Sequence, residues 1–443
     1  MGSIAPATQP LKVIVVGAGF GGLAAAIECV QRGFDVTLAE RYRDSNSYGD
    51  IIDFFANGGR LISRWGDGEV ARELNKICFI KVSAMELCNK DGKSLYSDPW
   101  YHRPKDHGLQ FAGHRGAMHT VVVEYVEKIG TKMLFGKQVV DYKETETRAG
   151  VVLADGEEIW ADAVIAADGG RSLAREKVLG IKDAKSSSGW AIFRAFFQVT
   201  DEMRANPLLK DFTDPEKETI RIWISNSTTM LGYAWNGGEN IAWVLMHKDE
   251  TDIVESWSLP ANKKDVEPLL TEHDPTCRAL LASTPADRLV DYKLVYRDPT
   301  DTWVSAGGRT ILIGDACHCH LPSSAQGGSQ ALEDAVTAAV CLEKSKGDVP
   351  LAFRTVERIR FDRSNAIHAS GALNRDEWHE IDWTALELDP KVLANRRFPL
   401  MLDFDAQKQA EKHFDAIAKD IKDGKKGNLK DLSLPSGQND QVA

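Results

Sequence analysis

The stretch Lys12–Arg41, KVIVVGAGFGGLAAAIECVQRGFDVTLAER, decides the fold of this chain. Its four apolar residues at 13–16 predict a buried strand, the glycines that follow predict a tight turn, and the Ala-rich segment to about Gln31 predicts a helix. Gly33 ends that helix, and FDVTLAE predicts a second strand. This is one βαβ unit, which indicates an α/β protein with a mostly parallel, Rossmann-like sheet.

The turn between the first strand and the helix carries the pattern G-x-G-x-x-G, formed by Gly17, Gly19 and Gly22. Only glycine lets the turn tighten while backbone N–H groups and the helix N-terminus approach a pyrophosphate. Glu40 ends the second strand 18 residues beyond Gly22, where a carboxylate accepts the ribose hydroxyls of an adenosine. Arg41 follows it and is included among the cofactor-binding candidates. The alternative is a glycine-rich turn without a ligand, which this full context disfavours.

Two segments far along the chain from the glycine turn indicate that the bound dinucleotide is FAD and not NAD. Asp168 follows a buried strand in AADGGRSLAREKVLG, and Asp315 follows another in ILIGDACHCHLPSSAQGGSQALEDA. An acid at a strand end accepts hydrogen bonds from the ribityl chain of a flavin. The later helix start at Gln326, Gly327 and Gly328 directs N–H groups at the flavin ring. A simple NAD-dependent dehydrogenase needs neither segment.

Together these segments resemble the single-component aromatic hydroxylases, the FAD-dependent monooxygenases of the para-hydroxybenzoate and salicylate hydroxylase type, over about residues 11–370. The resemblance implies noncovalent FAD, with NADPH or NADH as a transient reductant. It also implies that O₂ adds at flavin C4a to give a hydroperoxide, which transfers one oxygen to an electron-rich aromatic substrate. The chain departs from the family at Ala325, where the first glycine of P-x-x-G-Q-G is usual, and at ANGG, where PNA is more usual.

The resemblance also implies roles for individual residues. Arg115, in HRGAMH, contacts the cofactor near its ribityl and phosphate region, and Asp315 binds the ribityl hydroxyls. Asp168 belongs to a motif linked to both FAD and NAD(P)H. The remaining implied FAD ligands hold the ADP half: Gly17, Gly19, Gly22 and Glu40.

The sequence predicts a division into three parts. A discontinuous FAD-binding domain takes residues 11–80, 108–185 and 297–370, and residues 51–77 within it are predicted to be helical. A mainly antiparallel substrate domain takes residues 81–107 and 186–296, and residues 371–443 form a C-terminal helical segment and polar tail. Four tryptophans of the substrate domain are candidates either for an apolar substrate pocket or for ordinary core packing: Trp190, Trp223, Trp235 and Trp243.

Three polar residues interrupt apolar segments, and two of them, Asp50 and Arg194, are candidates for the substrate site. Asp50 and Asp53 lie in YGDIIDFFANGG, where Asp53 is interpreted as a helix N-cap and Asp50 as a general acid or a loop residue that bonds backbone. Arg194, in WAIFRAFFQV, shares a strand face with apolar neighbours. A buried arginine there requires either an ion pair or a ligand.

Asp50 and Arg194 resemble residues of a fungal subgroup, the indole 2,3-epoxidising flavin monooxygenases that form spiro-oxindoles. That resemblance implies epoxidation of the indole C2=C3 bond, epoxide opening assisted by protonated Asp50, and a semipinacol shift, with Arg194 bonded to a substrate carbonyl. Hydroxylation of a phenolic, salicylate-like substrate is the alternative within the enzyme class. A flavoprotein that binds without catalysis is the alternative from another class.

Composition and charge disfavour several classes of binding partner. The formal net charge of -11 and the scattered Lys and Arg disfavour nucleic acid and anionic membranes, and no apolar run approaches the roughly 20 residues that span a bilayer. Seven cysteines without framework spacing predict a reduced, cytoplasmic protein. Four adjacent residues of the CHCH at 317–320 cannot converge on one tetrahedral metal, so we assign none. We expect a monomer or weak homodimer.

Overall fold

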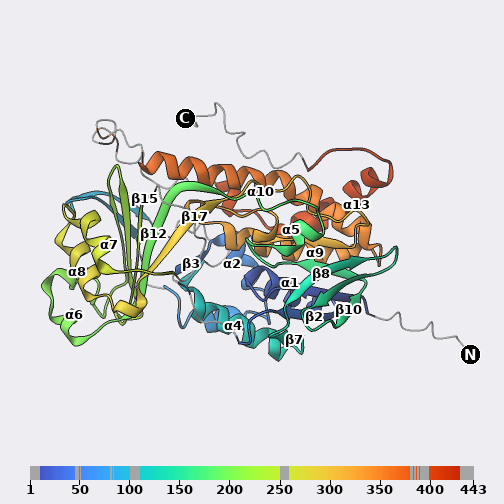
Figure 1. Cartoon of the computed structure of the whole chain (residues 1–443), viewed down its shortest axis with the longest axis horizontal. Helices are drawn as coiled ribbons and strands as arrows, with labels where there is room; N and C mark the ends of the chain where they lie inside the picture. The colour runs from blue at the N-terminus through green and yellow to red at the C-terminus, as the bar shows by residue number, and fades with distance from the viewer. Residues whose placement is uncertain are drawn as a thin grey trace, which may run out of the picture.

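The computed structural model describes residues 10–44, 49, 51–79, 82, 84–99, 110–249, 259–379, 383, 386, 389 and 399–429. The chain forms two main sheets, and Figure 1 shows them at different ends of the molecule, with β2 and β7 belonging to one end and β12, β15 and β17 to the other. Asp50 lies outside the described residues, and so do residues 100–109 and 430–443.

The parallel sheet is built around the predicted βαβ unit. Its strand order is β18 (Thr310–Leu312), β11 (Ala163–Ala166), β1 (Lys12–Val16), β2 (Asp35–Glu40) and β7 (Lys132–Phe135). Strand β1 lies in the middle, and Val15 on it pairs with Leu38 on one side and Ile165 on the other. Strand β11 is apolar throughout, and β1 is apolar after the exposed Lys12. Their buried residues form continuous hydrophobic runs, as in parallel strands covered on both faces.

The second main sheet has eight strands and is antiparallel except where β4 pairs with β13. Its order is β16 (Leu259–Pro260), β17 (Val290–Tyr296), β12 (Ser186–Gln198), β15 (Asn240–Lys248), β14 (Thr228–Trp235), β13 (Thr219–Ile224), β4 (Ala84–Asn89) and β5 (Ser94–Pro99). Two small sheets complete the strands: β8 (Val139–Glu144), β9 (Ala149–Leu153) and β10 (Glu158–Ala161), and the pair β3 (Ile51–Phe54) and β6 (Phe111–His114). The expected α/β class, with a mainly antiparallel second sheet, is confirmed.

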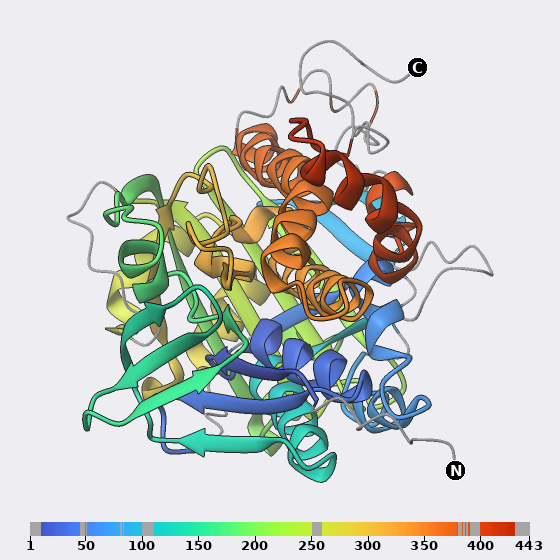
Figure 2. The same ribbon diagram turned by 90° about the vertical axis from the view of Figure 1, so that its right-hand side faces the viewer.

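The helices fall into two groups. Three cover the outer face of the eight-stranded sheet (Figure 1): α6 (Asp201–Ala205), α7 (Lys263–Val266) and α8 (Pro275–Ser283). The others surround the parallel sheet: α1 (Phe20–Gln31), α2 (Ala56–Ile62), α3 (Glu69–Leu74), α4 (Arg115–Lys128), α5 (Leu173–Lys177), α9 (Gly327–Lys344), α10 (Val349–His379), α12 (Pro399–Leu402) and α13 (Ala406–Lys422). Figure 2 shows α9, α10 and α13 gathered in orange and red beside the dark blue α1, and α9 contacts the other three.

The seven cysteines are reduced, and six of them are buried. Burial raises the pKa of the Cys29 thiol to about 12 and that of Cys88 to about 11, and it raises the pKa values of Cys78, Cys277, Cys317 and Cys341 as well. Cys319 is the partly exposed one. No helix in the described part of the chain is both long and apolar enough to span a bilayer.

The structure corrects the prediction for residues 51–77. Residues 51–54 form strand β3, paired with β6, before the helices α2 and α3 begin. Asp53 is therefore not a helix N-cap. The N-cap of α2 is Phe55, and the carboxylate of Asp53 accepts two hydrogen bonds from Gln110 Nε2 at 3.0 and 2.8 Å. The four residues of β3 are enough to pair with β6. The alternation of apolar and polar residues gives only a weak sequence signal over so short a strand.

The tryptophans divide between the two faces of the eight-stranded sheet. Trp223 and Trp243 lie in the core between the sheet and its outer helices, where their indole N–H groups donate to Asp274 Oδ2 and Thr284 Oγ1, each at 2.9 Å. For these two the pocket interpretation is wrong and core packing is right. Trp235 packs instead on the inner face, against Phe79, at a ring-centroid distance of 4.9 Å.

Candidate active site

The glycine turn after β1 has two tightly packed glycines and one open one. Gly17 has φ +100°, and a Cβ on it would lie 2.4 Å from Ala167 O, while a Cβ on Gly22 would lie 1.9 Å from Gly17 O. A Cβ on Gly19, the N-cap of α1, would meet nothing within 4 Å. Protein atoms thus fill the space beside two glycines and leave it free at the third, beside the helix N-terminus. That arrangement fits the pyrophosphate of a dinucleotide.

Glu40 is bound to the same turn. Its Oε2 accepts from Ala18 N at 2.7 Å and its Oε1 from Tyr42 N at 2.9 Å. Each carboxylate oxygen has a further lone pair, so the group can still accept a ribose hydroxyl. Arg41 is exposed and lies against the Tyr42 ring, with its guanidinium 5.0 Å from the ring centroid.

Arg115 begins helix α4 and lies next to the start of α1. Its guanidinium is 5.7 Å from the centroid of the Phe20 ring. His114 caps α4, because its Nδ1 accepts from Ala117 N at 3.2 Å, and its Nε2 donates to Gly49 O at 3.0 Å. A positive charge is thereby held beside the nucleotide turn, where the phosphates of a cofactor need one.

Asp168 and Asp315 follow adjacent parallel strands, β11 and β18. Asp168 Oδ2 accepts from Tyr142 Oη at 3.3 Å and from Ala174 N at 3.1 Å, whereas its buried Oδ1 has no partner among the described residues. Asp315 lies in the 3₁₀ turn Gly314–Ala316. Burial raises the pKa of its carboxyl, against the opposing positive charges of His318, Arg115, Arg175 and Arg297. The unpaired acceptor and the surrounding cations fit a polyhydroxyl chain that carries phosphates.

Arg175 joins the two acidic turns, a role that sequence reasoning missed. It is 5% exposed, and its guanidinium donates to Gly170 O at 3.2 Å, to Asp315 O at 2.9 Å and to Ala316 O at 2.9 Å. One side chain therefore fixes the turn after β11 against the turn after β18. The available signal was an arginine three residues after Ser172, the N-cap of α5, in a segment otherwise short of buried charge.

Gln326 is the N-cap residue of α9. The Gln326 side chain is buried, and its Oε1 accepts from Asn57 Nδ2 at 2.8 Å. A Cβ on Gly328 would lie 2.9 Å from Phe54, whereas one on Gly327 would meet only His320 at 3.8 Å. Ala325 adopts φ +51°, the left-handed conformation that favours the usual glycine. The loop shape is therefore kept despite the substitution, and Gly327 is the open position.

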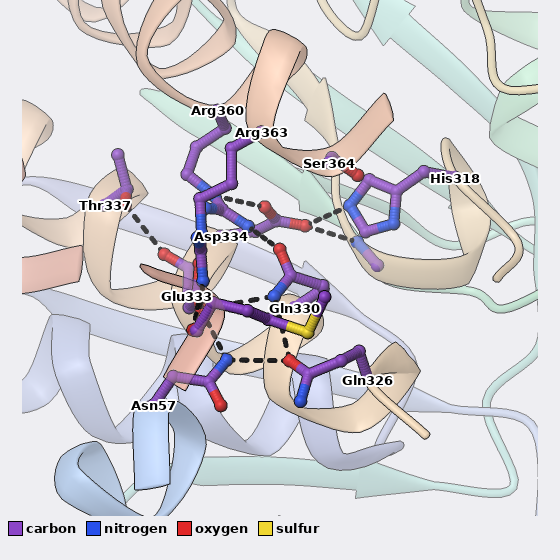
Figure 3. A network of polar contacts seen from close by, with 12 residues as sticks. Asn57, His318, Gln326, Gln330, Glu333, Asp334, Thr337, Arg360, Arg363 and Ser364 are labelled. Atoms are coloured by element: carbon purple, nitrogen blue, oxygen red, sulfur yellow. Dashed lines mark hydrogen bonds and ion pairs between the residues drawn. The ribbon is translucent and has the colours of Figure 1, made fainter. Parts of the chain in front are cut away.

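A fully buried ion network lies behind these turns (Figure 3). Glu333, on α9, accepts from Arg360 Nη1 at 2.5 Å and from Arg363 Nη2 at 2.8 Å, both on α10. Arg360 Nε donates to Asp334 Oδ1 at 2.8 Å. Asn57 Nδ2 donates to Glu333 Oε1 at 2.7 Å. The network connects α2, α9 and α10, and it includes Asn57, the residue shared with the family's PNA.

The CHCH segment belongs to the same network. Cys317, His318 and Asp334 are the described residues whose potential metal-ligating atoms lie close together, within 4.8 Å. All three are already engaged: Cys317 Sγ donates to Gly314 O at 3.4 Å, and His318 Nε2 contacts Asp334 Oδ2 at 2.5 Å. We interpret the cluster as three side chains held by internal hydrogen bonds.

Arg194 lies on the inner face of the eight-stranded sheet, toward the nucleotide-binding half. It is 8% exposed, and its guanidinium lies 5.6 Å from the centroid of the Tyr292 ring. Neighbouring apolar side chains on this face remain partly exposed: Phe196, Leu231, Val244 and Met246. His114 stacks on Phe196 at 4.0 Å and bonds the carbonyl of Gly49. Through His114, Gly49, which directly precedes Asp50, is thus linked to the sheet face that carries Arg194.

Comparison with known proteins identifies the class. A family model described as an FAD-binding domain matches residues 116–346, and one described as an NAD(P)-binding Rossmann-like domain matches residues 15–46. The fold and the site define a flavoprotein, and the chain belongs to the FAD-binding family. It is an FAD-dependent monooxygenase that takes its electrons from NAD(P)H, so the expected enzyme class and cofactors are confirmed.

Its relatives are similar along almost their full length. The flavin-dependent monooxygenase pboD of Aspergillus ustus is 31% identical over 94% of this chain and 93% of that protein. The notoamide E oxidase notB of Aspergillus sp. (strain MF297-2) is 32% identical over 94% of this chain and 91% of that protein. The crystal structure of CtdE in complex with FAD and a substrate superposes with a TM-score of 0.87, at 28% identity, over 93% of this chain and 100% of that chain.

Proposed function

We propose that this enzyme epoxidises the indole C2=C3 bond of an indole alkaloid and that the epoxide rearranges by a semipinacol shift to a spiro-oxindole. One oxygen atom of O₂ enters the product, the other leaves as water, and NAD(P)H supplies the two electrons. FAD, when bound, supplies the activated oxygen. The proposal extends the resemblance of Asp50 and Arg194 to indole-epoxidising enzymes.

The observation that carries the proposal is Arg194 on a partly exposed apolar face. Arg194 is 8% exposed and lies beside partly exposed apolar side chains, so its N–H donors can meet a ligand bound on this face. A substrate with a flat hydrophobic ring and an amide carbonyl satisfies both features: the ring packs on Phe196 and Val244, and Arg194 donates to the carbonyl. Fixing the carbonyl orients one face of the indole toward the oxidant and determines the stereochemistry.

Replacing Arg194 with Leu is expected to raise KM for an indole amide substrate by about 10–100-fold, because a hydrogen bond to a charged group contributes about 1.5–3 kcal/mol. NAD(P)H oxidation continues but releases more hydrogen peroxide. Arg221→Leu is the matched control, because Arg221 lies on the opposite face of the same sheet, over Trp223 at 5.8 Å. Steady-state kinetics with peroxide detection give the result, and equal KM values for both variants contradict the assignment.

Replacing Asp50 with Asn is expected to leave flavin reduction by NAD(P)H unchanged and to slow spiro-oxindole formation by about 100-fold, the scale of general acid catalysis. Asp50 donates a proton to the epoxide oxygen as the C–O bond breaks, and the carbonyl formed by the 1,2-shift loses a proton, so the acid is restored with no net proton uptake. Stopped-flow absorbance measures flavin reduction, and mass spectrometry of the products measures the rearrangement. An unchanged rate and product would show that Asp50 has no acid role.

The substrate class itself is tested with purified holoenzyme, NADPH and NADH, ¹⁸O₂, and two panels of compounds, one tryptophan-derived and one phenolic. The expected result is substrate-stimulated NAD(P)H oxidation and a gain of one labelled oxygen on an indole. Stimulation by phenols alone, with ring hydroxylation, overturns the indole proposal in favour of a salicylate-hydroxylase-like activity.

A further inference from the structure

The histidines of the CHCH segment form a buried chain behind the turn that carries Asp315. His318 is 0% exposed, and its Nδ1 lies 3.2 Å from His320 Nδ1, while its Nε2 lies 2.5 Å from Asp334 Oδ2. His320 Nε2 lies 3.2 Å from the carbonyl oxygen of Ser364. Each contact needs one proton, so the donors and acceptors can be assigned one by one.

His320 is the neutral member of the chain. A carbonyl oxygen only accepts, so the proton between His320 and Ser364 is on His320 Nε2. Burial, together with the neighbouring rings of His318 and His368, lowers the pKa of His320 well below its usual value. Its Nδ1 therefore has no proton, and the hydrogen between the two Nδ1 atoms must come from His318.

Asp334 is ionised, which fixes the second proton of His318. Its Oδ2 accepts from Gly314 N at 3.0 Å and its Oδ1 from Arg360 Nε at 2.8 Å. The guanidinium charge of Arg360 and these two donated hydrogen bonds favour the ionised carboxylate, independently of His318. His318 Nε2 therefore donates to a carboxylate, and both ring nitrogens of His318 carry protons.

We propose that His318 is a fixed imidazolium that places a positive charge behind the Gly314–Ala316 turn and stabilises the negatively charged reduced state of the bound flavin. Hydride transfer adds two electrons and one proton, so it leaves the flavin with one negative charge. A preorganised cation stabilises that charge. His318 acts across the turn, so it is a positioning residue.

The charge of His318 is not cancelled within the network of Figure 3. The carboxylates of Glu333 and Asp334 balance the guanidiniums of Arg360 and Arg363 in number, and His318 adds one positive charge. Asp334 Oδ2 accepts from both Gly314 N and His318, so one oxygen holds the first residue of the turn and the imidazole two residues beyond its end. Burial raises the pKa of the Asp315 carboxyl within this turn, and the charge of His318 opposes that rise.

The test compares the two-electron reduction potential and the sulfite affinity of holoenzyme variants. His318→Gln keeps a donor toward Asp334 without the charge, and sulfite, which adds to oxidised flavin and leaves an anion, is expected to bind about tenfold more weakly. The potential is expected to fall by the equivalent ~30 mV. His368→Phe is the control, because it removes a buried neutral histidine whose ring lies 5.7 Å from that of His320. Unchanged values for His318→Gln, or equal losses in both variants, overturn the proposal.

A second measurement uses the wild-type protein, so it does not depend on whether a variant folds. In ¹⁵N-histidine-labelled holoenzyme at pH 7.5, the expected spectrum shows both ring nitrogens of His318 protonated, and His320 with Nε2 protonated and Nδ1 bare. One bare nitrogen on His318 contradicts the assignment. Neither measurement uses an aromatic substrate, so both are independent of the indole proposal.

Discussion

Replacing Glu333 with Gln is expected to lower the free energy of unfolding by about 3–5 kcal/mol, the scale for breaking a buried ion pair from one side. Glu333 is fully buried and accepts from Arg360 and Arg363. Burial would raise the pKa of its carboxyl, but these two arginines hold it below its usual value. Removing the charge leaves two buried guanidiniums with Asp334 as the remaining carboxylate of the network. Urea unfolding of the holoenzyme, followed by circular dichroism, measures the loss.

Two further variants separate the buried network from an ordinary ion pair. Glu73→Gln breaks the exposed pair with Lys76 and is expected to change stability by less than about 0.5 kcal/mol. Adding Arg363→Met to Glu333→Gln is expected to restore part of the lost stability, because a buried unpaired cation is removed with its partner. If the double variant is as unstable as the sum of both single variants, the two residues do not interact as the structure indicates.

Replacing Gly22 with Ala is expected to abolish FAD binding in practice, with an affinity at least about 100-fold lower. A Cβ at this position would lie 1.9 Å from Gly17 O and 3.0 Å from Gly17 C, so the backbone of the turn itself must move. Overpacking of this kind costs about 1–3 kcal/mol, and here it distorts the turn that holds the pyrophosphate. The purified protein should be colourless, and flavin fluorescence titration measures the affinity.

Gly19→Ala is the informative comparison. A Cβ there meets no protein atom within 4 Å, so the apoprotein is expected to unfold at the wild-type temperature, whereas Gly22→Ala lowers that temperature. FAD affinity should still fall in Gly19→Ala, because the methyl group occupies the space at the N-terminus of α1. Wild-type affinity in this variant would show that the open space beside Gly19 does not receive the cofactor.

Local sequence was sufficient to predict the main elements of the nucleotide-binding half of the molecule. The βαβ unit at 12–40 and helix α9 at Gly327 were predictable, because their periodicity and glycine positions are encoded within each segment. Strand β3 was missed, because it is four residues long and is stabilised by a partner almost sixty residues away. Pairing with β6, and not the pattern of residues 51–54, decides that segment.

The side-chain contacts of the site were less predictable than the residues themselves. Arg175 was visible in the sequence, but its bonds to backbone carbonyls of a turn 140 residues later depend on the tertiary fold. The contact of the Gln326 side chain with Asn57, 269 residues away, also depends on the tertiary fold. The buried His318–Asp334 contact likewise arises only when α9 packs behind the turn after β18. Polar contacts between distant segments leave no local pattern to read.

The buried thiols have a consequence for an enzyme that handles O₂. A flavin monooxygenase that releases hydrogen peroxide instead of product exposes its own side chains to an oxidant, and thiolates react far faster than thiols. Six of the seven cysteines are buried with raised pKa values, so they stay protonated and out of reach, while Cys319, partly exposed between His318 and His320, is the first site of damage to examine. The packing of this chain thereby limits self-inflicted oxidation during unproductive turnover.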